Sequence, residues 1–384
     1  MLEIEVDLTV DLCGLELSSP LILASGTLSE PGSLIKKLAK TQPLGAVVTR
    51  SISLRSEEDR FTNPSPRFVK LGRYGLLNCE CQLIHSIDEW CNRELGIAKE
   101  AGIPIIASIE GDSVEDYVEL SERLTDAGAD AIEVNISCTF EARRGKGPAL
   151  MDHIGSLLSA VRKAVSGIPM IVKVPLVLDF GEIAEVVQKA GADAIAALNT
   201  VGPGMVIDID TGRPLLGFFT GSGGLSGPAL RPIAVAAVNE LSRAVKLPVV
   251  GIGGISTGLD VVEFTMAGAT GVQLLTAALL RGPNVFTQIH KQLTKWMKKK
   301  GYTSLSEIRG MVNQFLGETN WTPFVALIDK DLCTGCKRCV RVCPHDAIKM
   351  NSKDKAEVDT DLCAGCGLCW YECPEKAIRL KDFP

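Results

Sequence analysis

Residues 333–344 read CTGCKRCVRVCP and residues 363–374 read CAGCGLCWYECP. Both stretches follow the pattern C-x2-C-x2-C-x3-C-P, so eight of the 13 cysteines lie in two copies of one motif. Thiolates at this spacing wrap a cubane iron–sulfur cluster, and in two-cluster ferredoxins the fourth cysteine ligates the other cluster. The sequence therefore predicts two 4Fe–4S clusters. The expected ligands are Cys333, Cys336, Cys339, Cys343, Cys363, Cys366, Cys369 and Cys373.

Two other uses of cysteine fit this spacing less well. Structural zinc sites take four ligands from well-separated pairs, whereas here a third and a fourth cysteine follow each pair at once. A disulfide framework belongs to secreted chains, and the acidic start MLEIEVD is not typical of a signal peptide. Iron held by reduced thiols favours a cytoplasmic protein that moves single electrons.

The overall composition is that of a globular protein with room for one large and one small domain. The chain has 384 residues, of which 46% are hydrophobic and 22% are charged. A net charge of −6 argues against nucleic acid as the main partner. No stretch reaches the roughly 18 apolar residues of a membrane span. We expect the lysines between residues 291 and 300 to lie on the exposed face and end of a helix.

Eight short apolar segments without polar alternation predict strands that are buried on both faces. They are PLILAS (20–25), GAVVTR (45–50), PIIASI (104–109), AIEVN (131–135), MIVKV (170–174), DAIAAL (193–198), PVVGIG (248–253) and GVQLL (271–275). Helical patterns lie between them, for example at 114–127, 179–190, 228–245 and 257–267. This alternation over about 250 residues predicts a (β/α)8 TIM barrel. The alternative is an open doubly wound sheet, which usually carries a glycine-rich turn after its first strand.

No G-x-G-x-x-G motif occurs in the sequence, so we expect no nicotinamide site of the chain's own. The predicted domains are the barrel at residues 1–310, a linker at 311–328, and an α+β ferredoxin-like domain at 329–384. Two long segments, 51–84 and 199–227, follow the second and sixth strands and are expected to form lids over the active-site face. Metal binding should supply much of the folding free energy of the small domain.

Three features at the expected carboxyl ends of the strands indicate chemistry. Gly253 and Gly254 open a helix after the seventh strand, with Thr276 after the eighth, which suits a phosphate group. Lys173 lies among apolar residues, and a buried ammonium needs a partner. The alternatives are a Schiff base, a carboxylate or an anionic reduced flavin, and a flavin fits best beside clusters that need a two-electron to one-electron converter.

Cys138 and a set of amides complete the candidate residues. Cys138 lies just past the fourth strand, where a thiol could exchange a proton with a substrate, although an inert buried cysteine is the alternative. Asn78, Asn135 and Asn199 each offer a donor and an acceptor to a planar polar ring. The remaining cysteines are expected to be structural, though Cys79 and Cys81 could approach the site.

Taken together, several segments resemble the dihydroorotate dehydrogenase family over nearly all of residues 1–290. They are SSPLILASGT, NPSPRF, EVNISC, IVKV, LNT, GGLSGPALRPIA and GIGGIS. The order of a barrel, then GYTSLSEIRGMVN, then two cluster motifs is similar to the catalytic part of dihydropyrimidine dehydrogenases. The resemblance implies an FMN bound by Ser25, Arg50, Ser51, Asn135, Lys173, Leu198, Gly227, Gly253, Gly254, Leu275 and Thr276.

The resemblance also implies the roles of the substrate-facing residues. Cys138 would be the acid/base for the substrate C5 proton while a hydride passes between C6 and the flavin N5. The residues implied to face the ring are Asn78, Asn135, Asn199 and Thr200. The chain departs from the family pattern at four places: Arg50 replaces a lysine, Phe140 an asparagine, Leu275 a glycine, and residues 79–83 a Gly-Leu segment. Arg50 keeps the charge but presents a planar fork that suits a carboxylate.

The main hypothesis is an oxidoreductase acting on CH–CH groups. It would interconvert a pyrimidine-like ring, of the orotate, uracil or thymine type, and its 5,6-dihydro form, with electrons relayed through the clusters. The expected partner is an NAD(P)H-oxidising flavoprotein subunit or a soluble ferredoxin, and analogy favours a homo- or hetero-oligomer. Two alternatives are a flavin-dependent reductase of a non-pyrimidine unsaturated substrate and a non-catalytic electron-transfer subunit.

Overall fold

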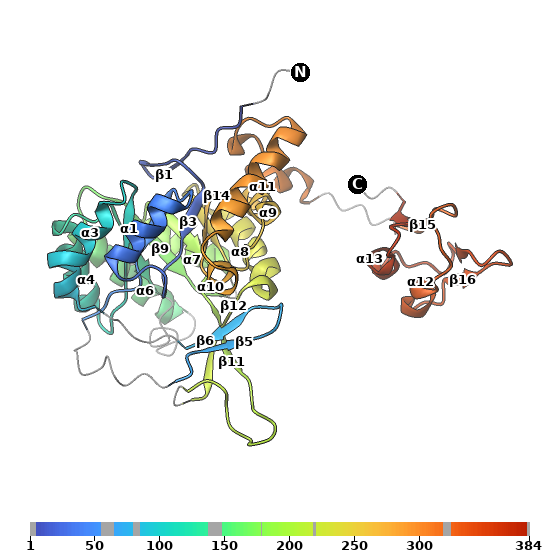
Figure 1. The fold of residues 1–384 in the computed structure, drawn as a ribbon. Helices are drawn as coiled ribbons and strands as arrows, with labels where there is room; N and C mark the ends of the chain where they lie inside the picture. Colours follow the sequence, from blue (N-terminus) through green and yellow to red (C-terminus); the bar gives the residue numbers. More distant parts are fainter. Residues whose placement is uncertain are drawn as a thin grey trace. The chain divides into compact units, whose positions relative to one another are not determined.

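The computed structural model describes residues 5–54, 65–79, 85–136, 148–177, 179–217, 220–317 and 324–381. The chain divides into two compact units, Met1–Gln314 and Phe315–Pro384. In the larger unit, eight parallel strands close into a barrel in the order β10-β13-β14-β3-β4-β7-β8-β9 (Figure 1). The strands are β3 (Leu21–Leu23), β4 (Ala46–Val48), β7 (Ile105–Ile109), β8 (Ala131–Asn135), β9 (Met170–Val174), β10 (Ala194–Ala197), β13 (Val249–Ile252) and β14 (Ala269–Leu274). The prediction of a TIM barrel is confirmed: seven of the eight expected segments contain a barrel strand, and the eighth, 271–275, overlaps β14, which begins two residues earlier.

Helices surround the barrel. They are α1 (Gly32–Thr41), α2 (Ile87–Glu89), η2 (Trp90–Glu94), α3 (Leu95–Lys99), α4 (Val114–Asp126), α6 (Pro148–Ala164), α7 (Phe180–Lys189), η3 (Pro228–Leu230), α8 (Arg231–Ala244), α9 (Gly258–Ala267), α10 (Thr276–Arg281) and α11 (Val285–Lys300), followed by η4 (Leu305–Glu307) and η5 (Met311–Phe315).

The start of α4 shows why these segments are helical. Ser113 and Asp116 form a capping box, in which each side chain accepts a hydrogen bond from the backbone N–H of the other residue. Tyr117, Leu120 and Leu124 then bury one face of the helix against the barrel. The lysines of α11 are exposed at its surface and end, as predicted.

The two long segments expected to form lids pair with each other. They contribute β5 (Phe68–Lys70) and β6 (Leu76–Asn78) from the first segment, and β11 (Val201–Met205) and β12 (Ser222–Ser226) from the second. The four strands form an antiparallel sheet in the order β11-β12-β6-β5, which lies beyond one end of the barrel (Figure 1). Within this lid sheet Asn78 is paired with Gly224. One lid element therefore carries residues from both segments.

A hairpin of β1 (Val10–Leu12) and β2 (Leu15–Leu17) precedes the barrel and was not predicted from the sequence. Leu12 and Leu17 are fully buried and belong to the main hydrophobic core. Its short strands and single turn carry little periodicity, so tertiary burial rather than local pattern defines it.

The small unit contains two antiparallel strand pairs and two short helices. Its elements are β15 (Ala326–Ile328), α12 (Arg338–Val342), β16 (Ile348–Met350), β17 (Ala356–Val358), α13 (Leu368–Glu372) and β18 (Ile378–Leu380). β15 lies in the stretch expected to be a linker, 311–328, but it pairs with β18 and so forms part of this unit. The buried core is small and includes Cys339 and Cys369 themselves.

Because the cysteines form much of this core, we expect the small unit to unfold when its iron is removed. After oxidative chelation of the iron, hydrogen–deuterium exchange should show loss of amide protection over residues 326–380, while the strands of the barrel stay protected. A small unit that keeps its protection without iron would show that its hydrophobic core suffices.

Candidate active site and cysteine cages

A cavity of about 880 Å³ lies in the larger unit. Residues at or just after the carboxyl ends of all eight barrel strands line it, together with residues of β6 and β12 from the lid sheet. This is the end at which TIM barrels carry their active sites, and the volume is that of a cofactor site. The fold therefore places one large cavity where the sequence predicted chemistry.

Every described residue expected to bind the cofactor or the substrate lines this cavity. They are Ser25, Arg50, Ser51, Asn78, Asn135, Lys173, Leu198, Asn199, Thr200, Gly227, Gly253, Gly254, Leu275 and Thr276. Cys79 and Glu110 also line the cavity, and the carboxylate of Glu110 was not anticipated. Cys81, Cys138 and Phe140 lie outside the described residues.

Lys173 lies on β9 with 7% of its side chain exposed, and its Nζ is 3.9 Å from Oε1 of the fully buried Glu133 on β8. Glu133 also accepts hydrogen bonds from Gln273 Nε2, at 2.7 Å, and from Ser108 Oγ, at 3.4 Å. A buried charge needs such compensation. The charge of Lys173 therefore has a carboxylate partner within the barrel, while the residue also lines the cavity. The only sequence signal for Glu133 is an acidic residue inside the apolar strand AIEVN.

Hydroxyl and amide groups from neighbouring strand ends form a continuous chain of contacts. Ser25 Oγ and Ser51 Oγ lie 3.5 Å apart, and Asn135 Nδ2 donates to Ser51 Oγ at 3.3 Å. Asn199 Nδ2 donates to Asn135 Oδ1 at 3.3 Å. Asn199 Oδ1 in turn accepts from the backbone N–H of Thr200 at 2.8 Å. The side chains on this wall therefore orient one another, as a site for a polar planar ring requires.

The glycines after β13 form a narrow turn against the loop that contains Gly227. Gly253 and Gly254 have φ of 124° and 79°, in the region that favours glycine. A Cβ on Gly254 would lie 2.8 Å from the carbonyl oxygen of Gly227. Beside them, Thr276 Oγ1 donates to Ser226 Oγ at 2.9 Å at the start of α10. Such a turn lets a phosphate approach the backbone closely.

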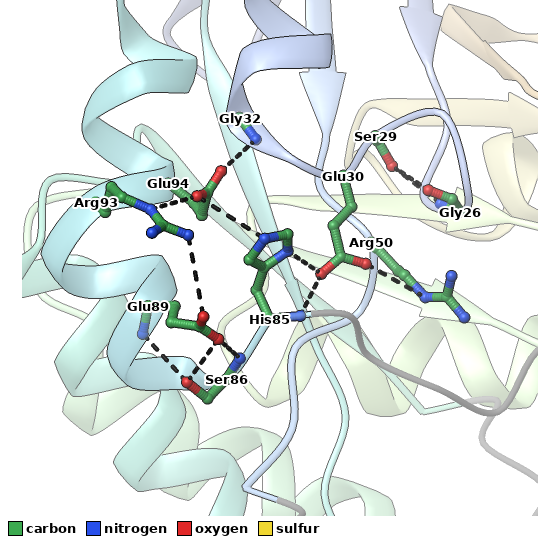
Figure 2. A network of polar contacts seen from close by, with 10 residues as sticks. All are labelled: Gly26, Ser29, Glu30, Gly32, Arg50, His85, Ser86, Glu89, Arg93 and Glu94. Carbon is green, nitrogen blue, oxygen red and sulfur yellow. Dashed lines mark hydrogen bonds and ion pairs between the residues drawn. The ribbon is translucent and has the colours of Figure 1, made fainter. Parts of the chain in front are cut away.

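Arg50 is joined to the protein surface by a chain of charged side chains (Figure 2). Its Nε lies 3.8 Å from Glu30 Oε2, and Glu30 Oε1 lies 2.9 Å from His85 Nδ1. His85 Nε2 faces Glu94 Oε1 at 3.9 Å, and Arg93 Nε donates to the same oxygen at 2.7 Å. Figure 2 shows the terminal nitrogens of Arg50 pointing away from Glu30. Sequence reasoning missed this network, because no motif links its members.

The eight motif cysteines surround two small cavities in the small unit. Cys333, Cys336, Cys339 and Cys373 line one cavity, and Cys343, Cys363, Cys366 and Cys369 line the other. The fourth cysteine of each motif thus joins the cage of the other motif, the arrangement of two-cluster ferredoxins. Among the described residues, no three His, Cys, Asp or Glu side chains are grouped as ligands of a single ion. The four cysteines around each cavity match the ligand set of one cubane cluster.

The thiols of the cages differ in acidity. Burial, together with the nearby Cys363 and Cys366, raises the pKa of Cys369 to about 11. At Cys333 burial acts to raise the pKa, but hydrogen bonds from backbone N–H groups and the charge of Lys355 outweigh it, so the pKa is lowered. Since metal binds thiolates, loading the cages must release protons.

The fold lowers the reactivity of Cys13, a thiol that lies outside the cages. Burial raises its pKa to about 12, with Asp193 and Asp11 contributing, from 9.0 in an exposed thiol. The folded state therefore gains stability from this group below pH 9.0, and the gain is lost as the pH rises through about 12.

At pH 9.0 we expect iodoacetamide to label Cys13 in urea and not in the native protein, as read by mass spectrometry. Equal labelling in both states would contradict this.

The Arg50–Glu30 pair should matter for stability. In Glu30→Gln the buried guanidinium loses this carboxylate partner, and we expect the free energy of unfolding to fall by about 3 kcal/mol in urea titrations. The control is Glu100→Gln, which removes the partner of Lys36 in an exposed ion pair and should change stability little. Equal effects of the two substitutions would show that the Glu30 network is only a surface-like contact.

No helix among the described residues is long and apolar enough to cross a membrane.

Two family models match the chain. A dihydroorotate dehydrogenase model matches residues 7–297, and a 4Fe-4S dicluster domain model matches residues 326–380. Similar curated proteins carry the name dihydroorotate dehydrogenase B (NAD(+)), catalytic subunit. The protein of Methanosarcina mazei is 38% identical over 311 residues, covering 79% of this chain and 95% of that protein. The protein of Caldicellulosiruptor bescii is 37% identical over 313 residues, covering 80% of this chain and 100% of that protein.

The protein of Bacillus pumilus is 36% identical over 305 residues, covering 79% of this chain and 96% of that protein. These relatives are matched almost from end to end, whereas about a fifth of this chain lies outside each match. The fold, the cavity and both matches lead to one conclusion: the chain belongs to the dihydroorotate dehydrogenase family of oxidoreductases and carries in addition a 4Fe-4S dicluster domain.

Proposed function

We propose that the chain interconverts a pyrimidine-like ring and its 5,6-dihydro form, and that two 4Fe–4S clusters relay the electrons to or from a partner. One observation carries the proposal: the residues predicted for the flavin and for the ring all line a single cavity at the active-site end of the barrel. The relatives are named for dihydroorotate, which makes an orotate-type ring the first candidate. Uracil and thymine types follow.

The residues present fit FMN. The cavity of about 880 Å³ can hold it, and the glycine turn with Thr276 offers a phosphate site. Lys173 would stabilise negative charge on the reduced ring, and Ser25, Ser51, Asn135 and Leu198 would border it. When bound, FMN supplies reversible two-electron chemistry and passes electrons on one at a time.

The chain's own residues would then bind and orient the substrate. Asn135 and Asn199 hold each other in place, and Asn78 Nδ2 donates to the carbonyl oxygen of Gly224 at 3.1 Å, which fixes it in the lid sheet. Amides fixed in this way can pair with ring N–H and C=O groups. Arg50 would bind a ring carboxylate through its planar fork. We assign the exchange of the C5 proton to Cys138.

The electrons would leave through the cysteine cages. The relatives' name includes NAD(+) and the word subunit, whereas this sequence has no dinucleotide motif after a strand. We infer that a separate flavoprotein subunit handles the nicotinamide or that a soluble ferredoxin exchanges the electrons. The dicluster domain at residues 326–380 would give the chain its own site for one-electron exchange.

An anaerobic titration tests the function. The purified chain, with its FMN and iron counted, is mixed with dihydroorotate, dihydrouracil or dihydrothymine while flavin and cluster absorbance are followed. We expect one of these rings to bleach the flavin. If dithionite bleaches it and no ring does, the substrate is not a pyrimidine. If the purified chain contains no flavin, a non-catalytic role is favoured instead.

Cys138→Ser tests the proton transfer. Loss of the thiol should slow turnover by about 100-fold or more near neutral pH, with FMN and iron content unchanged. Cys91→Ser is the control, because Cys91 lies outside the cavity and donates to the carbonyl oxygen of Arg123. Turnover of Cys138→Ser at the wild-type rate would remove its role.

A further inference from the structure

The two halves of the dicluster domain are structural repeats, so each half is an internal control for the other. Helices α12 and α13 begin five residues after the first cysteine of their motifs and have the same length. Each follows a residue in the left-handed conformation, with φ of 62° at Lys337 and 79° at Gly367. Each is followed by the fourth cysteine, Cys343 or Cys373, with ψ of 111° in both. A difference between equivalent side chains is therefore not required by the backbone.

The outward-facing side chains of the two halves differ in charge. On helix α12 and the residue before it, the three fully exposed side chains are cations: Lys337, Arg338 and Arg341. The equivalent positions of the second half hold no charge: Gly367, Leu368 and Tyr371. Among the described residues, no carboxylate forms an ion pair with these three cations, which we call the cationic face. A chain with a net charge of −6 thus presents a local concentration of positive charge here.

Lys337 is the least expected member of the cationic face. A left-handed conformation costs free energy for a residue with a Cβ, and Gly367 shows that glycine serves at the equivalent position. Stability alone would therefore favour glycine at residue 337. The exchange Lys337→Gly therefore removes a charge without straining the backbone.

The cationic face adjoins one of the two cages. Lys337 lines the same cavity as Cys333, Cys336 and Cys339, and Cys336 is exposed. One carboxylate, that of Glu375, also borders this cavity. A protein that bound the cationic face would therefore come close to the exposed edge of this cage.

We propose that the cationic face is the docking site of an acidic one-electron carrier protein, and that the adjoining cage holds the cluster that exchanges the electron. The proposal rests on the proposed function, since it requires clusters in the cages. In each event the reduced cluster loses one electron and the carrier gains it, and no proton or bond change is needed. Positive charge beside the cage attracts a negative surface and orients it, which raises the association rate at low salt.

The test replaces the three cations of the first half by the residues found at the equivalent positions of the second half. The variant Lys337→Gly/Arg338→Leu/Arg341→Tyr carries the side chains that the equivalent backbone already accepts. The control, Lys291→Gln/Lys295→Gln/Lys299→Gln, removes the same number of charges from exposed positions on α11. The probe is a plant-type 2Fe–2S ferredoxin, an acidic carrier. Its binding to the iron-loaded chain is measured by calorimetry, and its reduction by the dithionite-reduced, desalted chain is measured by stopped flow.

We expect the exchanged surface to weaken ferredoxin binding about tenfold or more at low ionic strength and to remove its salt dependence, with reduction slowed in parallel. The control should bind like the wild type. Equal weakening in both variants, or in neither, would overturn the proposal. So would equal binding of the wild type to a DNA oligonucleotide, which would indicate a general attraction of polyanions. A chain that contains no iron after anaerobic purification would instead refute the proposed function, and the docking site with it.

Discussion

The buried pair of Lys173 and Glu133 is the constraint around which the catalytic end of the barrel is organised. Their charges lie 3.9 Å apart on adjacent strands, and both side chains are nearly or fully excluded from water. Removing one partner of such a pair costs about 3–5 kcal/mol, because the other charge stays buried. Glu133 is held in turn by Gln273, so a contact across the barrel fixes where the ammonium faces the cavity.

The lid sheet completes the site from the other side. Because β6 pairs with β12, residues from two separate segments of the chain form one wall, and Asn78 is positioned by a bond to Gly224. Barrel strands of this kind supply a rigid floor, while inserted loops decide what the cavity accepts. The Glu30–His85–Glu94 network also holds the site in place. Glu30 contacts Arg50 at one end of the network, and Glu94 contacts Arg93 at the surface at the other end (Figure 2).

The sequence predicted the features that a local residue pattern encodes and missed the contacts between residues that are far apart in the chain. All eight barrel strands could be predicted because strands buried on both faces have a continuous apolar sequence. The cysteine spacing predicted that the fourth cysteine of each motif lies with the first three cysteines of the other motif. The Glu133–Gln273 bond joins residues 140 positions apart, and the His85–Glu30 contact joins residues 55 apart. Neither leaves a periodic signal. Lys173 was expected to need a partner, but the carboxylate that serves it could be identified only once β8 and β9 lay side by side.

In the proposed function, electrons taken from a dihydropyrimidine in the barrel reach the cysteine cages. Electron paramagnetic resonance of the anaerobic protein, frozen soon after one equivalent of the dihydro ring is added, tests it most directly. Signals of reduced 4Fe–4S clusters should appear as fast as the product forms. Product formation with the clusters still oxidised would contradict it, because the barrel would then work without the small unit.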